Sequence, residues 1–134
     1  WHSGDIGNLN CLKKLERNKK LRAVYGNIDN DLIRRETKEY LFFSIDSLKF
    51  LIIHIAGSPS NYNSKTKKLI KNYKPDILIC GHSHILKIKR DNKYDLLYIN
   101  PGACGKVGFH NIKTIVRFEI ENKKIKNLEA IELR

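Results

Sequence analysis

The stretch ILICGHSH, residues 77–84, places four apolar residues ahead of a glycine turn that carries two histidines. The apolar run is short and contains no alternating polar residue. Such a run is typical of a strand that is buried on both faces, as in the sheets of α/β proteins. The loops beyond the ends of these strands are where α/β folds place their sites. We therefore predict an α/β fold with a site that includes His82 and His84.

In the regions around this stretch, apolar periodicity and turn residues predict alternating helices and strands. Before it, the expected elements are a helix from near Asn8, a strand over 22–27, two strands over 38–45 and 48–55 joined by a tight turn, a loop over 57–64, and a helix capped by Asn63 or Ser64 and ended by Pro75. After it, the expected elements are strands over 85–89 and 94–100, a loop over 100–111, and a half-exposed hairpin over 114–133. This order predicts an α/β sandwich with mixed sheets.

The length and composition are those of one globular domain. The chain has 134 residues, of which 41% are hydrophobic and 30% charged, as in ordinary soluble domains. No apolar run approaches the roughly 20 residues that cross a bilayer, so we expect no membrane segment. Three cysteines (Cys11, Cys80 and Cys104) include no C-x-x-C pair. We expect free thiols and a cytoplasmic location.

The chain is strongly basic, with 26 Lys and Arg against 14 Asp and Glu and a formal net charge of +12. Basic surfaces attract polyanions such as nucleic acids. Here, however, the basic residues are spread along the chain with few aromatic residues between them, which indicates a compositional bias. We favour that explanation over a nucleic-acid partner.

Four short stretches share one pattern, in which a buried run ends and a side chain able to bind a metal follows. They are Gly4-Asp5, Gly26-Asn27, IIHI with His54, and GHSH with His82 and His84. Glycine lets the backbone turn sharply and approach an ion. Oxygen donors mixed with imidazole suit manganese, iron or zinc better than calcium. The two histidines of GHSH could serve two ions roughly 3.5–4 Å apart, as in two-metal hydrolases.

Each stretch alone has a simpler explanation. A Gly-Asp or Gly-Asn pair after a strand is more often a turn, and His54 at the end of an apolar strand is more often a core histidine than a ligand. GHSH is the strongest single signal. The four stretches together, each at the end of a separate strand, favour the site.

The succession GD, GN-x-D, H, GH-x-H and NPG resembles the calcineurin-like metallophosphoesterases, most closely their small phosphodiesterase branch, which is also related to the retromer scaffold subunit. The resemblance covers nearly the whole chain. It implies a four-layer α/β/β/α sandwich of two mixed sheets and a centre of two divalent metal ions. Manganese is the expected metal, and iron, zinc and nickel are alternatives.

The resemblance also assigns roles to individual residues. Asp5 matches the carboxylate that bridges the two metals, and His84 matches a ligand of the first metal. The second metal has three further ligands, which match Asn27, His54 and His82. In the same family, Asp29 matches a carboxylate that orients a neighbouring group, and the loop over 100–102 matches a wall of the phosphate pocket. The implied catalytic residues are Asp5, Asn27, Asp29 and His82.

Three positions depart from the family pattern. The family's D-x-H motif, which supplies two ligands to the first metal, would precede Trp1. We expect residues 1–134 to be a single domain that lacks its first strand and helix, although the loss of half of one metal site would leave the same sequence. Ile28 replaces a histidine that assists the leaving group, so leaving groups that need little protonation are expected. Ile55 follows His54 where glycine is usual.

These features predict a metal-dependent phosphoesterase, specifically a phosphodiesterase that uses a metal-bridging hydroxide for in-line attack on phosphorus. The expected partner is a small-molecule phosphoester, with no membrane partner and with homo-oligomerisation left open.

Lys106 and His110 are candidates for contacts to the substrate phosphate, although a solvated loop is the favoured explanation for both. Small buried residues are the expected role of Cys80 and Cys104. The alternative function is a non-catalytic scaffold that binds proteins on the same fold.

Overall fold

The computed structural model describes residues 1–18 and 20–134. Its helices are α1 (Leu9–Asn18), α2 (Asp31–Glu36) and α3 (Ser64–Tyr73). Its strands are β1 (Tyr40–Ile45), β2 (Leu48–Ile53), β3 (Gly57–Ser58), β4 (Asn61–Tyr62), β5 (Ile77–Ile79), β6 (Leu86–Asp91), β7 (Leu96–Pro101), β8 (Lys113–Glu121) and β9 (Lys124–Leu133).

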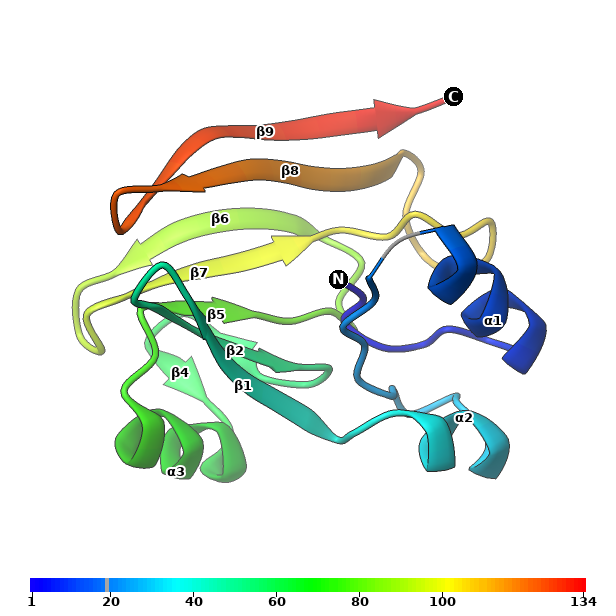
Figure 1. The fold of residues 1–134 in the computed structure, drawn as a ribbon, viewed down its shortest axis with the longest axis horizontal. Coiled ribbons are helices and arrows are strands. Elements are labelled where there is room, and N and C mark those ends of the chain that lie inside the picture. Colours follow the sequence, from blue (N-terminus) through cyan, green and yellow to red (C-terminus); the bar gives the residue numbers. More distant parts are fainter. Residues whose placement is uncertain (19) are drawn as a thin grey trace.

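The centre of the fold is a five-stranded sheet in the order β1-β2-β5-β7-β6. Strands β2, β5 and β7 run parallel to one another, whereas β1 and β6 pair antiparallel at the two edges. The carboxyl ends of the three parallel strands therefore lie at one edge of the sheet, where open α/β sheets bind ligands. Figure 1 shows β5 and β7 ending toward the side of the molecule that holds α1 and α2.

Both faces of this sheet are covered at its centre, which explains why β5 and most of β2 read as continuous apolar runs. On one face α3 packs through Leu69 and Ile70 against a cluster that includes Leu51 and Leu78. On the other face the β8–β9 hairpin packs against a cluster that includes Phe50, Ile52 and Ile79. Figure 1 shows β8–β9 and α3 on opposite sides of the sheet. The predicted α/β class and the mixed sheet are confirmed.

A third cluster joins α1 and α2 to the extended segments that carry Asp5 and Asn27. It contains the buried residues Ile6, Leu12, Ala23 and Ile33. The Asn8 side chain accepts a hydrogen bond from the Cys11 N–H at 2.8 Å, which caps α1. This cluster packs the two segments against α1 and α2, and Val24 of the second segment belongs to the central-sheet cluster that includes Phe50 and Ile52.

Several local predictions are confirmed. Asp46 and Ser47 form the tight turn between β1 and β2 with positive φ angles of 47° and 64°, as in the favoured hairpin turns. Asn63 caps α3, because its side chain accepts from the Thr66 N–H. Pro75 follows Lys74, the C-cap residue of α3, and the half-exposed hairpin over 114–133 is present as β8–β9.

Two local predictions are wrong, and one helix is missing from the prediction. The expected strand over 22–27 is an extended segment that pairs through isolated bridges, from Ala23 to His2 and from Val24 to Lys38. Among the described residues, no neighbour extends either bridge into a ladder. The expected loop over 57–64 contains the small hairpin β3–β4. The helix α2 was not predicted, because its six residues are too few to show a helical period.

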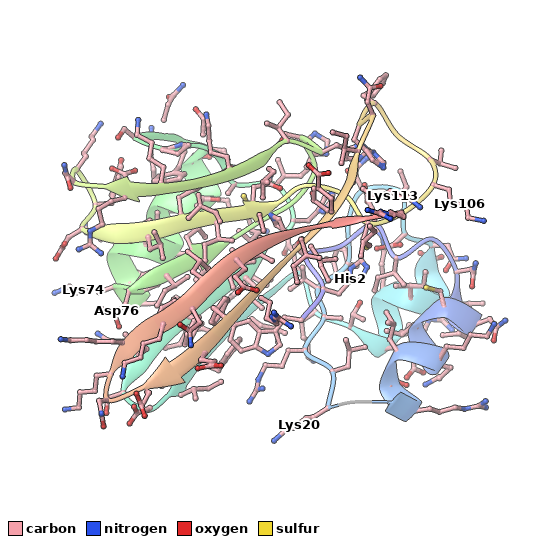
Figure 2. The ribbon with its side chains drawn as sticks, turned by 90° about the horizontal axis from the view of Figure 1, so that it is seen from above. His2, Lys20, Lys74, Asp76, Lys106 and Lys113 are labelled. Carbon is pink, nitrogen blue, oxygen red and sulfur yellow. The ribbon has the colours of Figure 1, made fainter. Side chains whose placement is uncertain are left out.

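The basic side chains are distributed over the molecule. Figure 2 shows Lys74 at one end of the sheet, Lys106 at the other, and Lys20 apart from both.

Within the described part of the chain, no helix has the length and apolarity that spanning a membrane requires. All three cysteines are free, as predicted; Cys80 is buried, but Cys104 is exposed and not the small buried residue that was expected.

Candidate metal centre

Two of the predicted ligands come from neighbouring parallel strands. His54 follows the end of β2, and His82 follows the end of β5 after the Gly81 turn. The Gly81 N–H donates to the His54 carbonyl oxygen at 3.0 Å, which continues the pairing of the two strands past their ends. The ring centroids of the two histidines lie 5.3 Å apart. The sheet itself thus holds both imidazoles at one point of its edge.

Asp5 and Asn27 reach the same point from the extended segments. Ligand atoms of Asp5, His54 and His82 all lie within 4.8 Å of one another. The Asn27 Oδ1 atom lies 3.0 Å from the His54 Nε2 atom and 3.0 Å from the His82 Nδ1 atom. The structure therefore brings together four of the five predicted metal ligands.

The contacts of His54 determine which ring nitrogen faces the group. Its Nδ1 atom lies 2.6 Å from the Ser3 carbonyl oxygen. A carbonyl oxygen can only accept, so Nδ1 carries a proton. Metal-binding histidines commonly donate their second ring N–H to a carbonyl in this way. The Nε2 atom then faces the Asp5 Oδ2 atom at 3.2 Å and the Asn27 Oδ1 atom at 3.0 Å.

This arrangement points three acceptors at one place. A neutral His54 presents a lone pair at Nε2, and the carboxylate and amide oxygens beside it also accept. Acceptors that converge in this way repel one another unless a cation or an added proton lies between them. The donor set of one carboxylate, one amide oxygen and two imidazoles is the chemistry that manganese, iron or zinc accepts. The residues fit a divalent metal.

The backbone at the site is held in uncommon conformations. Asp5, His82 and His84 have φ angles of 57°, 68° and 59°. Non-glycine residues adopt this region rarely, and such conformations cluster at functional sites. Gly26 is required for a steric reason, because a Cβ atom there would lie 2.0 Å from the Asp5 Oδ1 atom. The backbone of the 26–29 turn packs directly on the Asp5 carboxylate.

Asp29 connects the two turns that carry Asp5 and Asn27. Its buried carboxylate accepts from the Gly26 N–H at 2.8 Å and from the Gly7 N–H at 2.9 Å. Arg34 supports the same turn, donating from Nε to the Asp29 carbonyl oxygen at 2.7 Å and from Nη2 to the Gly26 carbonyl oxygen. Sequence reasoning missed Arg34, since one arginine among 26 basic residues carries no distinguishing signal.

Asn100 holds the GHSH turn in place. Its side chain is buried and donates to the Gly81 carbonyl oxygen at 2.8 Å and to the Ser83 Oγ atom at 3.0 Å. Asn100 thus acts on the backbone around His82 from the end of β7. Cys80 lies beneath it, donating to the Tyr98 hydroxyl at 3.1 Å, and burial raises the pKa of the Cys80 thiol to about 11.

His84 lies outside the group of Asp5, His54 and His82. Its Nδ1 atom accepts from the Phe109 N–H at 3.3 Å, and its ring meets that of His110 with centroids 5.3 Å apart. The His110 Nε2 atom lies 2.9 Å from the Gly105 carbonyl oxygen. Figure 2 shows Lys106 on the same loop, near Lys113. A metal role for His84, and phosphate contacts by His110 and Lys106, stay predictions.

His2 packs beside the group without joining it. Its Nδ1 atom accepts from the Gly4 N–H at 3.2 Å, and its side chain is half-buried. Burial lowers the pKa of His2. An unprotonated Nδ1 that accepts from a backbone N–H agrees with that direction.

Comparisons with known proteins identify the family and the fold of the chain. The chain is 33% identical over 133 residues to a probable metallophosphoesterase of Methanocaldococcus jannaschii, covering 98% of this chain and 65% of that protein. A solved archaeal phosphodiesterase matches with a TM-score of 0.73 and 30% identity over 98% of this chain and 81% of the other. Vps29 of Entamoeba histolytica, crystallised as a single mutant, shares the fold with a TM-score of 0.70 and 16% identity, covering 98% and 80%.

The chain thus spans about two thirds of the length of that curated relative. A family model described as the calcineurin-like phosphoesterase superfamily domain matches residues 1–123. That range contains every residue of the acceptor group described above, as well as His84. The chain belongs to the calcineurin-like phosphoesterase superfamily.

Proposed function

We propose that this protein is a metal-dependent phosphodiesterase whose centre includes Asp5, Asn27, His54 and His82. The observation that carries the proposal is the convergence of acceptors: His54 Nε2 lies 3.2 Å from Asp5 Oδ2 and 3.0 Å from Asn27 Oδ1, with its proton on the far nitrogen. A cation at this point would satisfy all of these atoms at once. The archaeal phosphodiesterase among the similar structures supports a diester substrate.

Divalent ions held by these donors would supply Lewis acidity, which generates a water nucleophile at neutral pH and offsets charge on the phosphoryl oxygens. The chain's own residues supply position. The Ser3 carbonyl oxygen orients the His54 ring. The Asp29 carboxylate holds the turns of Asp5 and Asn27 at a fixed position relative to each other through hydrogen bonds from the Gly7 and Gly26 N–H groups. His84 would contribute to a second metal, as the family resemblance implies. Two ions, with manganese preferred, are part of the proposal.

The turn at Asn27 also bears on the leaving group. Ile28 is 63% exposed beside the site, and its side chain has no proton to give. Its backbone N–H donates to the Asp5 Oδ1 atom at 3.2 Å. We therefore expect substrates whose leaving group is stable as an anion, such as an aryl oxide, to react faster than simple alkyl esters.

The test is hydrolysis of bis(p-nitrophenyl) phosphate by the full-length protein with added Mn²⁺. We expect the protein to release p-nitrophenolate. This release should stop when the metal is chelated and should be absent in the Asp5→Ala and His82→Ala variants. An Asp95→Ala variant is the matched control, since Asp95 is an exposed aspartate that pairs with Arg90 away from the site. Absence of turnover, or turnover indifferent to Asp5 and His82, would contradict the proposal.

A protein-binding scaffold is the second candidate. The loop between β7 and β8 exposes Val107 to 91% and Phe109 to 100%, and exposed apolar side chains mark contact surfaces when they gather. A scaffold would retain partner binding in the Asp5→Ala variant and lose it when Val107 and Phe109 become serine. Metal-dependent turnover that survives the loop variant would favour the enzyme.

A further inference from the structure

We propose that the pocket beside His82 receives the ester group that stays on phosphorus, and that this group is apolar and about the size of one ring. The inference rests on the proposed function and names its substrate class. It is drawn from the position of the pocket, the chemistry of its walls and its volume.

The pocket adjoins the candidate metal centre. It has a volume of about 270 Å³, and Gly81 and His82 form part of its lining. The His82 Nδ1 atom lies 3.0 Å from the Asn27 Oδ1 atom. One side chain therefore belongs both to the acceptor group and to the pocket wall. A phosphate held at the acceptor group would have one substituent within reach of the pocket.

The walls of the pocket are largely apolar. Ile55, Ala56, Ile85 and Tyr98 line it, and Ile55 and Ile85 are 41% and 63% exposed. The Tyr98 hydroxyl is already engaged, donating to the Gly57 carbonyl oxygen at 3.2 Å. The Tyr98 hydroxyl is therefore not a free polar group in the pocket wall. Exposed isoleucines beside a polar site lose water-contacting area when an apolar group binds, which favours binding.

The residues that follow two of the candidate ligands form this apolar wall. Ile55 follows His54 and Ile85 follows His84, so the same turns that aim imidazoles at the site also present an isoleucine to the pocket. The polar lining residues include Ser58 and the exposed Lys87. A polar or anionic substituent at the outer end of the ligand would meet Lys87.

The volume limits the size of the group. A dry cavity of about 150 Å³ holds benzene, and pockets for drug-sized ligands begin at about 300 Å³. A space of about 270 Å³ that is open to solvent accepts one ring or a short chain, and is too small for two nucleosides. The substrate class is therefore a phosphodiester with one compact apolar ester group.

The retained group fits these walls better than the leaving group. The leaving oxygen gains negative charge during hydrolysis, and charge beside isoleucine side chains is disfavoured because they cannot solvate it. A neutral retained group meets no such penalty. The leaving oxygen would then face water or the bound metals, away from Ile55 and Ile85.

The experiment compares two substrates that share one leaving group: phenyl p-nitrophenyl phosphate and methyl p-nitrophenyl phosphate. We expect kcat/KM to favour the phenyl ester by about 10-fold or more, in the range that apolar pockets discriminate. The Ile85→Ser variant should reduce the phenyl-to-methyl ratio, and Ser58→Phe, which fills the pocket, should reduce it further. The intrinsic reactivities of the two esters are the same for every variant, so they cancel when the phenyl-to-methyl ratios of kcat/KM are compared between variants.

Ile112→Ser is the matched control, because Ile112 is 54% exposed and lies outside the pocket lining. It should leave both rates and their ratio unchanged. If both esters are hydrolysed but Ile85→Ser and Ser58→Phe leave the ratio as it was, the pocket assignment is wrong while the proposed function stands.

A measurement without turnover separates the two proposals completely. Calorimetric titration of the Mn²⁺-loaded protein with phenyl phosphate and with methyl phosphate should show tighter binding of the phenyl compound, and Ile85→Ser should abolish the difference. If neither ester is hydrolysed, the proposed function fails, and this titration alone decides the pocket. Equal affinities for the two phosphates would overturn the inference.

Discussion

The Nδ1 atom of His54 lies 2.6 Å from the carbonyl oxygen of Ser3, and this contact sets the chemistry of the site. The two residues are 51 positions apart in the chain. By accepting a hydrogen bond from Nδ1–H, the carbonyl directs Nε2 toward Asp5 and Asn27. A buried histidine with its proton directed away from two acceptors is preorganised for a cation.

The first prediction concerns the charge of Asp5. Asp5→Asn keeps the shape of the side chain and tolerates the positive φ of 57°, but removes the carboxylate. We expect the affinity for Mn²⁺ to fall at least about 10-fold, as measured by calorimetry and elemental analysis. Asp95→Asn is the control, with a φ of 52° at an exposed site. Unchanged Mn²⁺ affinity in Asp5→Asn would exclude this carboxylate as a ligand.

The second prediction concerns Gly26. In Gly26→Ala the new Cβ atom would lie 2.0 Å from the Asp5 Oδ1 atom, so the turn must shift. We expect the free energy of unfolding to fall by about 1–3 kcal/mol and metal binding to weaken, as measured by urea denaturation and calorimetry. Gly105→Ala is the control, since a Cβ atom there meets nothing within 4 Å. Similar losses of stability and metal affinity in Gly26→Ala and Gly105→Ala would show that the contact with Asp5 does not cause them.

The third prediction concerns pH and Asp91, which anchors the β3–β4 hairpin. Burial alone would raise the pKa of Asp91, but hydrogen bonds from Tyr62, Ser60 and the Lys93 N–H outweigh burial and lower the pKa from 3.8. The folded pKa is therefore below the unfolded pKa. The resulting stabilisation is full above the unfolded pKa and is lost as pH falls through the folded value.

Asp91→Asn tests this account, because it removes the charge while keeping the size of the side chain. We expect it to lower the free energy of unfolding by about 2–3 kcal/mol at pH 7, with a difference from wild type that is constant above about pH 5 and shrinks below about pH 4. Denaturation with urea across this range measures it. A difference that does not change with pH would exclude the ionised carboxylate as the cause.

The fourth prediction concerns thiol reactivity. Burial raises the pKa of Cys80 to about 11 and its Sγ atom faces Tyr98, whereas Cys104 is exposed. Ellman's reagent should therefore modify Cys104 in the folded protein, leave Cys80 unmodified, and reach Cys80 only on unfolding, since the thiolate is the reactive form. Peptide mass mapping identifies the modified residue, and Cys104→Ser is the control. Fast labelling of Cys80 in the folded state would contradict the packing of β5.

The local chemistry of several elements could be predicted from the sequence. The turn at Asp46 and Ser47, the Asn63 cap and the buried strand before GHSH each depend on residues adjacent in the chain. The segment over 22–27 could not be predicted correctly, because an apolar run indicates burial but does not indicate whether a partner strand runs beside it. Val24 is buried, yet within residues 1–18 and 20–134 it forms a single bridge, to Lys38.

The sequence by itself determined the α/β class and the types of donor atom, because strand ends, glycine turns and histidine spacing are local properties. Only the tertiary structure decided which donors meet and how they are protonated. Asp5, Asn27, His54 and His82 come together because parallel β2 and β5 end at one edge of the sheet. The two extended segments reach that edge through Ser3, which contacts His54, and through Val24, which belongs to the central-sheet cluster. The proton position on His54 follows from Ser3, a contact across 51 positions that no local pattern encodes.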